Sequence, residues 1–346
     1  MSIPERFKVY VYCTTFNHKN FIEATMDGFV MQRTDFPYIC AILDDASTDG
    51  SAEIIRNYLE TSFLPAAETS QTDDYKLTVR RHKTNVNCFF AVYFLKYNHY
   101  SLKKSKDPYI IRWVDRSDYS AICEGDDWWI CPDKLQRQAD FLDSHPEYSM
   151  CSHVVGVYDQ DSDNLKHYPQ ESDKEYSLVD VASGGHYFQT LSVMYRNGII
   201  TQHMKSRFRI WQDVVLVYNL LKAGRGIRFK EEMGVYRVHC GGIWSGVDKQ
   251  AQDAWDFKLG QAIYDTEQTS IAALRLVHCF SKTLNRIWMI KNPSLIVPAL
   301  RTIAKHFGAG TACRIYFGKM LLSRNVVMRE FLEAHPIADK LSNQDK

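Results

Sequence analysis

The sequence of 346 residues lacks an apolar run of the roughly 18–20 residues that a membrane-spanning helix needs. The best stretch, residues 295–304, is interrupted by Arg301. Its nine cysteines include no CxxC pair, and an odd number in a chain of this size favours reduced thiols. The first eight residues are polar and do not resemble a secretory signal. We therefore expect a soluble protein of the cytoplasm.

The sequence also has little net charge. A total of +1 argues against a polycation that coats nucleic acid, so we expect no nucleic-acid partner. The charge is unevenly distributed, because residues 270–329 contain ten Lys or Arg and no Asp or Glu. Apolar residues alternate with these basic ones. We expect the C-terminal region, 251–346, either to lie on an anionic membrane surface at the inner face of the cell membrane or to pack on the main domain as a helical appendage.

A glycine-rich phosphate loop is missing as well, since neither a P-loop nor a GxGxxG pattern occurs. The first two-thirds of the chain alternate between strand-like and helix-like segments. This alternation predicts an α/β fold with a mostly parallel central sheet flanked by helices, in a domain covering 1–250. The expected strands are 8–15, 38–43, 119–123, 148–158, 190–195 and 227–238.

Two of these strands end in pairs of carboxylates, Asp44-Asp45 and Asp126-Asp127. In an open α/β sheet, ligands bind beyond the carboxyl ends of the strands. Two acidic clusters at one edge repel each other unless a cation lies between them. Mg²⁺ and Mn²⁺ prefer carboxylate oxygen and keep positions for phosphate oxygens. The pattern therefore predicts a divalent cation that binds a nucleoside diphosphate, whereas each pair taken alone is typical of a turn or a helix cap.

Five short segments follow one another in a fixed order. They read TTFN at 14–17, ILDDASTD at 42–49, CEGDDWW at 123–129, WQD at 211–213 and YRVHCGGIWS at 236–245. Together they resemble the motifs of the family-2 glycosyltransferases with a GT-A fold, in the bacterial group that decorates surface polysaccharides. The third segment resembles the stretch that contains the DxD signature, with Glu124 in the first acidic place. The similarity covers about residues 7–246.

The resemblance implies a Rossmann-like GT-A fold with a C-terminal helical extension, and an inverting transfer of one sugar from a nucleoside-diphosphate sugar. We expect a UDP-linked donor and a hydroxyl of a glycan or lipid-linked acceptor. The QxxRW motif of the processive members is missing, which favours single-sugar addition. Two alternatives remain: a nucleotidyltransferase that makes the activated sugar, disfavoured by the glycine-poor turn at 14–19, and a non-catalytic protein that binds sugar nucleotides or glycans.

The resemblance also implies a role for individual residues. The residues expected to bind the nucleotide sugar are Thr15, Asn17, Asp44, Asp45, Asn85, Glu124 and Asp126. Asp126 and His239 would hold the Mn²⁺ or Mg²⁺ cofactor. Asp213 would be the general base that takes the proton of the acceptor hydroxyl, although a helix cap is its structural alternative. The residues expected on the acceptor side are Asp127, Trp128 and Trp244, with a place in the core as the alternative for the two aromatic rings.

Overall fold

The computed structural model describes residues 2–184, 188–242, 246–283 and 293–313. The chain divides into two compact units. The first unit comprises 1–175, 188–199 and 223–239, and the second comprises 176–187, 200–222 and 240–346. This division differs from the expected boundary at residue 250, because two internal segments belong to the second unit.

The first unit is built on a mixed sheet whose central strands are parallel. These central strands are β1 (Phe7–Thr15), β2 (Tyr38–Asp44), β5 (Cys88–Leu95) and β6 (Ser117–Ile122), in the order β6-β1-β2-β5. Beyond β5 the sheet continues with β4 (Tyr75–Arg81) and β3 (Glu68–Gln71), both antiparallel to their neighbours. The parallel central strands confirm the predicted α/β class.

The other flank of the sheet supplies residues to the candidate site. Beyond β6 the order is β11 (Met194–Arg196), β8 (Tyr148–Asp159), β12 (Arg225–Val238) and β10 (Lys174–Tyr176). Two short strands lie off this path, β7 (Trp128–Trp129) paired with β12 and β9 (Asn164–Lys166) paired with β8. The strand expected at 190–195 is only partly formed. Its first half is the 3-10 turn η1 (Thr190–Ser192), because the N–H groups of Ser192 and Val193 donate to local carbonyls.

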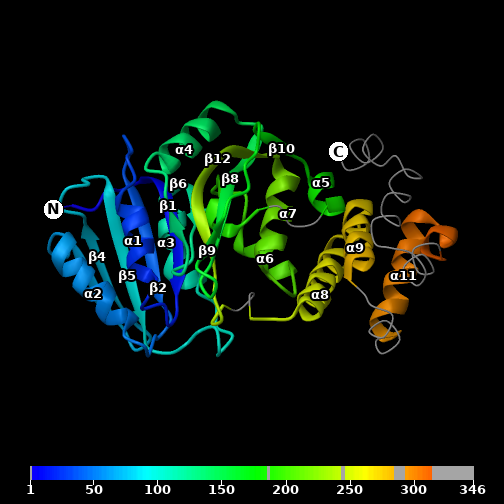
Figure 1. The fold of residues 1–346 in the computed structure, drawn as a ribbon, viewed down its shortest axis with the longest axis horizontal. Coiled ribbons are helices and arrows are strands. Elements are labelled where there is room, and N and C mark those ends of the chain that lie inside the picture. The colour runs from blue at the N-terminus through cyan, green and yellow to red at the C-terminus, as the bar shows by residue number, and fades with distance from the viewer. Residues whose placement is uncertain (1, 185–187, 243–245, 284–292, 314–346) are drawn as a thin grey trace. The chain divides into compact units, whose positions relative to one another are not determined.

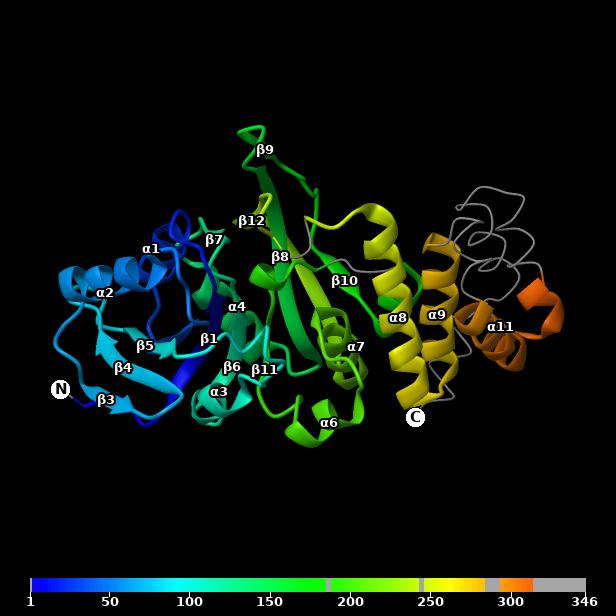
Figure 2. The same ribbon diagram turned by 90° about the horizontal axis from the view of Figure 1, so that it is seen from below.

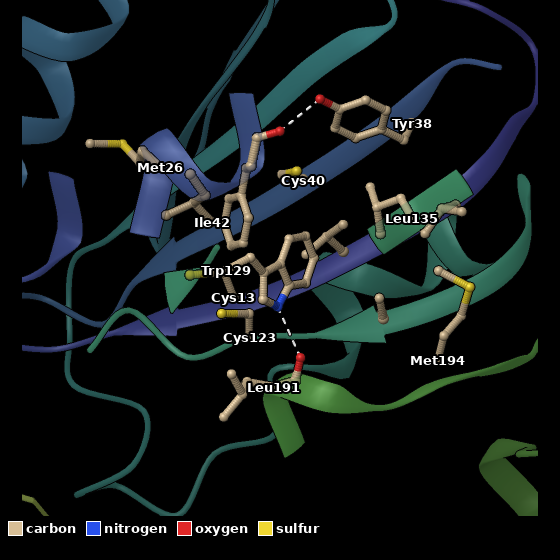
Figure 3. Packing of buried hydrophobic residues seen from close by; sticks show 14 of the residues in the cluster. Cys13, Met26, Tyr38, Cys40, Ile42, Cys123, Trp129, Leu135, Leu191 and Met194 are labelled. Carbon is tan, nitrogen blue, oxygen red and sulfur yellow. Dashed lines mark hydrogen bonds between the residues drawn. The ribbon is translucent and has the colours of Figure 1, made fainter. Parts of the chain in front are cut away.

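Helices cover both faces of the central strands (Figure 1). Apolar side chains of α1 (Ile22–Val30), α2 (Ser51–Ser62) and α4 (Lys134–Ser144) pack into the larger core cluster, and those of α3 (Asp107–Val114) pack into a second cluster. Figure 3 shows the larger cluster, where Trp129 Nε1 donates to the Leu191 carbonyl at 2.9 Å. Trp129 is therefore a core residue at the end of the acidic segment that follows β6.

The second unit is helical in its described part. Its helices are α5 (Leu178–Gly184), α6 (Gln202–Arg207), α7 (Asp213–Ala223), α8 (Lys249–Glu267), α9 (Ser270–Thr283) and α11 (Pro293–Phe307). Helices α8 and α9 lie side by side in both views (Figure 2), and their buried faces share one apolar cluster. Within the described ranges, no helix is both long enough and apolar enough to cross a membrane. The C-terminal region is thus helical over α8, α9 and α11, and residues 284–292 and 314–346 of it lie outside the described part.

Candidate functional site

The acidic segments after β2 and β6 lie on either side of the end of β1. The Asp45 N–H donates to the Thr15 carbonyl at 2.9 Å, and the Gly125 N–H donates to the Thr14 carbonyl at 2.9 Å. Gly125 is required here, since an added Cβ would lie 2.6 Å from the Cβ of Thr15. The two acidic segments therefore meet at one edge of the sheet, as the parallel strands predicted.

Asp126 lies beside two imidazoles at this edge. The Asp126 Oδ2 is 3.2 Å from His239 Nε2, just beyond the end of β12, and 3.8 Å from His18 Nε2, in the turn after β1. The ligand atoms of these three residues all lie within 4.8 Å of one another. A carboxylate oxygen with imidazole nitrogens is a donor set that suits Mn²⁺ and later divalent metals. The residues present therefore fit the cation that the sequence predicted, and they include His18, which the sequence analysis did not select.

Arg237 fixes the acidic segment to β12. Its backbone N–H donates to Asp127 Oδ1 at 2.8 Å, and its Nε donates to the Asp126 carbonyl at 2.9 Å. The guanidinium also lies 4.4 Å from the ring centroid of Trp128 and 4.5 Å from that of Phe21. These contacts hold Asp126 next to His239, which follows Arg237 by two residues.

Asp127 and Glu124 both make contacts within the protein. Asp127 is 2% exposed, and burial, followed by repulsion from Asp126 and Glu124, raises the pKa of its carboxyl group. Its side chain accepts from the β12 backbone, and its place on the acceptor side stays a prediction. The Glu124 carboxylate accepts from Thr190 Oγ1 at 2.9 Å, which ties the first acidic place of the DxD-like motif to η1.

Asp44 and Asp45, although adjacent, differ in their contacts. The Asp45 carboxylate accepts from the backbone N–H groups of His99 and Tyr100, at 2.7 and 3.1 Å, and pairs with Lys106 Nζ at 2.9 Å. Asp45 therefore anchors the loop before α3, and its contact with the nucleotide sugar stays a prediction. Asp44 is 3% exposed, and in the described part of the chain its Oδ1 has no hydrogen-bond partner. Burial raises the pKa of Asp44, and this oxygen can accept a hydrogen bond from a ligand.

The turn after β1 is tied to the turn after β2. The Asn17 N–H donates to Ser47 Oγ at 2.9 Å, and Asn17 Oδ1 accepts from the Thr48 N–H at 2.8 Å. The Lys19 N–H donates to Asp49 Oδ2 at 3.0 Å. Asn17 adopts a left-handed backbone with φ of 57°, which Asn tolerates better than most residues. Asn17 and Thr15 thus lie at the edge beside Asp44, and their contact with the nucleotide sugar stays a prediction.

Four further residues were predicted for the site, namely Asn85, Trp128, Asp213 and Trp244. Asn85 precedes β5, and its amide donates to the carbonyls of Val30 and Gln32, so it lies at the opposite end of the strands from the site. Trp128 is half-buried beneath Arg237, and its contact with an acceptor stays a prediction. Asp213 begins α7 in the second unit, and its catalytic role also stays a prediction. Trp244 lies outside the described residues.

No family model matches the chain. Two mycobacterial proteins, uncharacterized protein Mb1547 of Mycobacterium bovis and uncharacterized protein Rv1520 of Mycobacterium tuberculosis, are each 31% identical to it over 264 residues. The aligned part is 76% of this chain and 67% of either relative. The chain belongs to the family of these mycobacterial proteins.

The fold of this Rv1520-family member is similar to that of S. aureus TarS, a GT-A glycosyltransferase. TarS 1–349 in complex with UDP-GlcNAc gives a TM-score of 0.56 at 15% identity, covering 94% of this chain and 92% of TarS 1–349. A longer TarS chain gives a TM-score of 0.53 at 14% identity, covering 86% of this chain and 49% of the longer one. The chain therefore has the GT-A glycosyltransferase fold that the sequence motifs predicted.

Proposed function

We propose that this protein is an inverting, metal-dependent glycosyltransferase that moves one sugar from a nucleoside-diphosphate sugar, UDP-linked, to a hydroxyl of a glycan or lipid-linked acceptor. The observation that supports this most strongly is the meeting of Asp126 with His239 beside the ends of β1 and β6. The GT-A fold supports the same activity, and TarS, which shares it, was solved with UDP-GlcNAc.

In this proposal Asp44 recognises the nucleobase of the donor. Its Oδ1, which has no hydrogen-bond partner among the described residues, is a buried acceptor, and this costs about 1–3 kcal/mol while no donor reaches it. The imide N–H of a uracil ring supplies such a donor, so that binding of the base removes this cost. Asn17, which links the turns after β1 and β2, holds the walls of the same pocket.

Asp126 and His239 would hold the cation, Mn²⁺ or Mg²⁺. When bound, a divalent cation neutralises the negative charge that develops on the departing diphosphate. The protein's own contribution is to keep the two ligands together, through the bonds of Arg237 to the backbone of Asp126 and the side chain of Asp127. The acidic segment is thereby fixed before the donor arrives.

Asp213 would act as the general base. The acceptor oxygen attacks the anomeric carbon while the bond from that carbon to the diphosphate oxygen breaks, and the hydroxyl proton passes to the Asp213 carboxylate. One displacement of this kind inverts the configuration. A well-placed carboxylate contributes about 10²–10⁴-fold to the rate. The assignment rests on the resemblance of residues 211–213 to the family motif.

The basic C-terminal region would bring the enzyme to an anionic membrane surface, where a lipid-linked acceptor is found. Arg324 and Arg329 lie in this basic stretch of the sequence. The double variant Arg324→Glu, Arg329→Glu is expected to partition less onto vesicles containing phosphatidylglycerol than the native chain does. Equal partitioning of both proteins would argue for a helical appendage that does not bind lipid.

The activity itself is tested in two steps. A thermal-shift series with UDP, GDP and ADP, each with and without Mn²⁺, is expected to show the largest stabilisation with UDP and Mn²⁺ together. A ligand at a hundredfold excess over its Kd adds about 2.7 kcal/mol to the free energy of unfolding.

The second step uses a donor sugar that the protein is found to turn over. With this donor, Asp213→Asn is expected to lose about 10²–10⁴-fold in kcat while its affinity for UDP is kept. Asp140→Asn, on the surface of α4, is the matched control. A protein that binds UDP yet transfers and hydrolyses no sugar would be a binding protein.

A further inference from the structure

His18 is placed by the same contacts that join the turns after β1 and β2. Its two neighbours in the chain, Asn17 and Lys19, each donate a backbone N–H to a side chain of the second turn, at 2.9 and 3.0 Å. Asn17 Oδ1 also accepts a hydrogen bond from the Thr48 N–H of that turn. The backbone on both sides of His18 is therefore fixed, and its side chain is directed at the site by a preorganised turn.

Hydrogen bonds within the described residues do not explain why an imidazole is needed at position 18. The backbone carbonyl of His18 accepts from the first turn of α1, but this contact needs no imidazole. The side chain is 16% exposed, and in the described part of the chain its buried Nδ1 has no hydrogen-bond partner. Its Nε2 faces the Asp126 carboxylate at 3.8 Å, and its ring stands at 87° to that of His239 with the centroids 6.0 Å apart.

We propose that His18 is a third protein ligand of the cation, together with Asp126 and His239. The inference rests on the metal role proposed above for those two residues, and it adds the identity of the metal. Two imidazoles and one carboxylate form a mixed nitrogen and oxygen set, whose affinity rises along the first-row series of divalent metals that begins with Mn²⁺. Mg²⁺ prefers an all-oxygen set and keeps several waters, so it gains little from two imidazoles. The site therefore selects Mn²⁺ over Mg²⁺.

The test uses the full-length chain freed of metal by a chelator, with no nucleotide present. Mn²⁺ and Mg²⁺ affinities are measured by the free-Mn²⁺ EPR signal, directly and in competition. Electron spin-echo envelope modulation counts the imidazole nitrogens bound to Mn²⁺. The variants are His18→Gln, His239→Gln and, as a matched control, His203→Gln, whose side chain is exposed on α6.

The proposal predicts two imidazole nitrogens on Mn²⁺ in the native chain and one in His18→Gln. Loss of an outer partner of a metal ligand costs 10–100-fold in affinity, so loss of a ligand is expected to weaken Mn²⁺ binding by at least about tenfold. Mg²⁺ affinity is expected to fall much less, and His203→Gln is expected to match the native chain. If His18→Gln does not fold, the nitrogen count of the native chain decides alone.

One bound nitrogen in the native chain, or an unchanged Mn²⁺ affinity in folded His18→Gln, would overturn the role of His18 and leave Asp126 and His239 as ligands. A native chain that binds no Mn²⁺ at millimolar metal would overturn both the inference and the metal dependence of the proposed function. A calorimetric titration of the same protein with UDP separates the two. Two nitrogens on Mn²⁺ with no UDP binding would contradict the transferase and support the site.

Discussion

The Nε2 of His239 lies 3.2 Å from the Oδ2 of Asp126, although 113 residues separate the two in the chain. The pairing of β7 with β12 produces this distance, since Trp128 lies opposite Val235 in an antiparallel ladder. From there the two segments continue side by side, so that Asp127, the residue before β7, accepts a hydrogen bond from the Arg237 N–H. The separation of the two candidate ligands is thus set by strand register.

Arg237→Lys tests how this register is held. The variant keeps the positive charge but loses the Nε bond to the Asp126 carbonyl and the planar contact with the Trp128 ring. Mn²⁺ affinity, measured by calorimetry, is expected to fall about 10–100-fold. Arg228→Lys is the control on the same strand, because Arg228 bonds Gln170 instead of the acidic segment. Equal affinities in the two variants would show that Arg237 does not position the site.

Asp44→Asn and Asp45→Asn are expected to act on different properties. Asp45→Asn removes the charge that pairs with Lys106 and weakens the bonds to the loop before α3, so the free energy of unfolding is expected to fall by about 3 kcal/mol. Asp44→Asn removes a buried carboxylate that has an unpartnered oxygen in the described part of the chain. Stability is expected to stay equal or rise, while UDP affinity falls.

Urea unfolding and UDP titration of both variants check this contrast. A loss of stability in Asp44→Asn as large as that in Asp45→Asn would contradict it.

The sequence predicted the parts of the site that depend on strand order and motif chemistry. The strands at 8–15 and 38–43 were placed correctly, and Asp126 and His239 were selected as a pair. The strand Cys88–Leu95 was missed, because it is buried on both faces and shows no alternation of apolar and polar residues. His18 was missed because only the bonds between two turns bring it to Asp126.

A second limit of sequence-based prediction concerns adjacent residues of the same type, whose individual contacts the sequence does not distinguish. In Asp44-Asp45 and Asp126-Asp127 the two carboxylates of each pair have different partners, and those of Asp45 and Asp127 lie far away in the chain, at Lys106 and Arg237. A sequence motif does not show these distant partners, so the contacts of Asp45 and Asp127 could not be predicted from it. Asn85 was assigned by its position along the chain, and the structure shows it in the turn that precedes β5.

Lys134 provides a test of stability that is independent of the site. It is fully buried at the start of α4, where its Nζ donates to Gln138 Oε1 at 2.7 Å and lies 4.0 Å from the Trp129 ring centroid. Burial lowers the pKa of Lys134 from its ordinary value of 10.5 to about 7. Between these two values the unfolded chain binds a proton that the folded chain does not.

The contribution of Lys134 to the free energy of unfolding therefore rises with pH from about 7 to 10.5, by about 1.4 kcal/mol per pH unit. Lys134→Met lacks this slope. Its stability relative to the native chain is expected to be highest near pH 7 and to decline toward pH 9.5, as measured by urea unfolding at each pH. Parallel pH curves for the two proteins would mean that Lys134 is not buried in the neutral form.

The proposed transfer depends on a cation that is held at Asp126 and binds the donor diphosphate. The most direct measurement is anomalous scattering at the manganese edge from a crystal of the full chain grown with UDP and Mn²⁺. We predict one manganese peak within bonding distance of the Asp126 carboxylate and His239 Nε2, in contact with the diphosphate, with the uracil ring on Asp44. UDP bound elsewhere, or bound here with no manganese beside Asp126, would contradict the account.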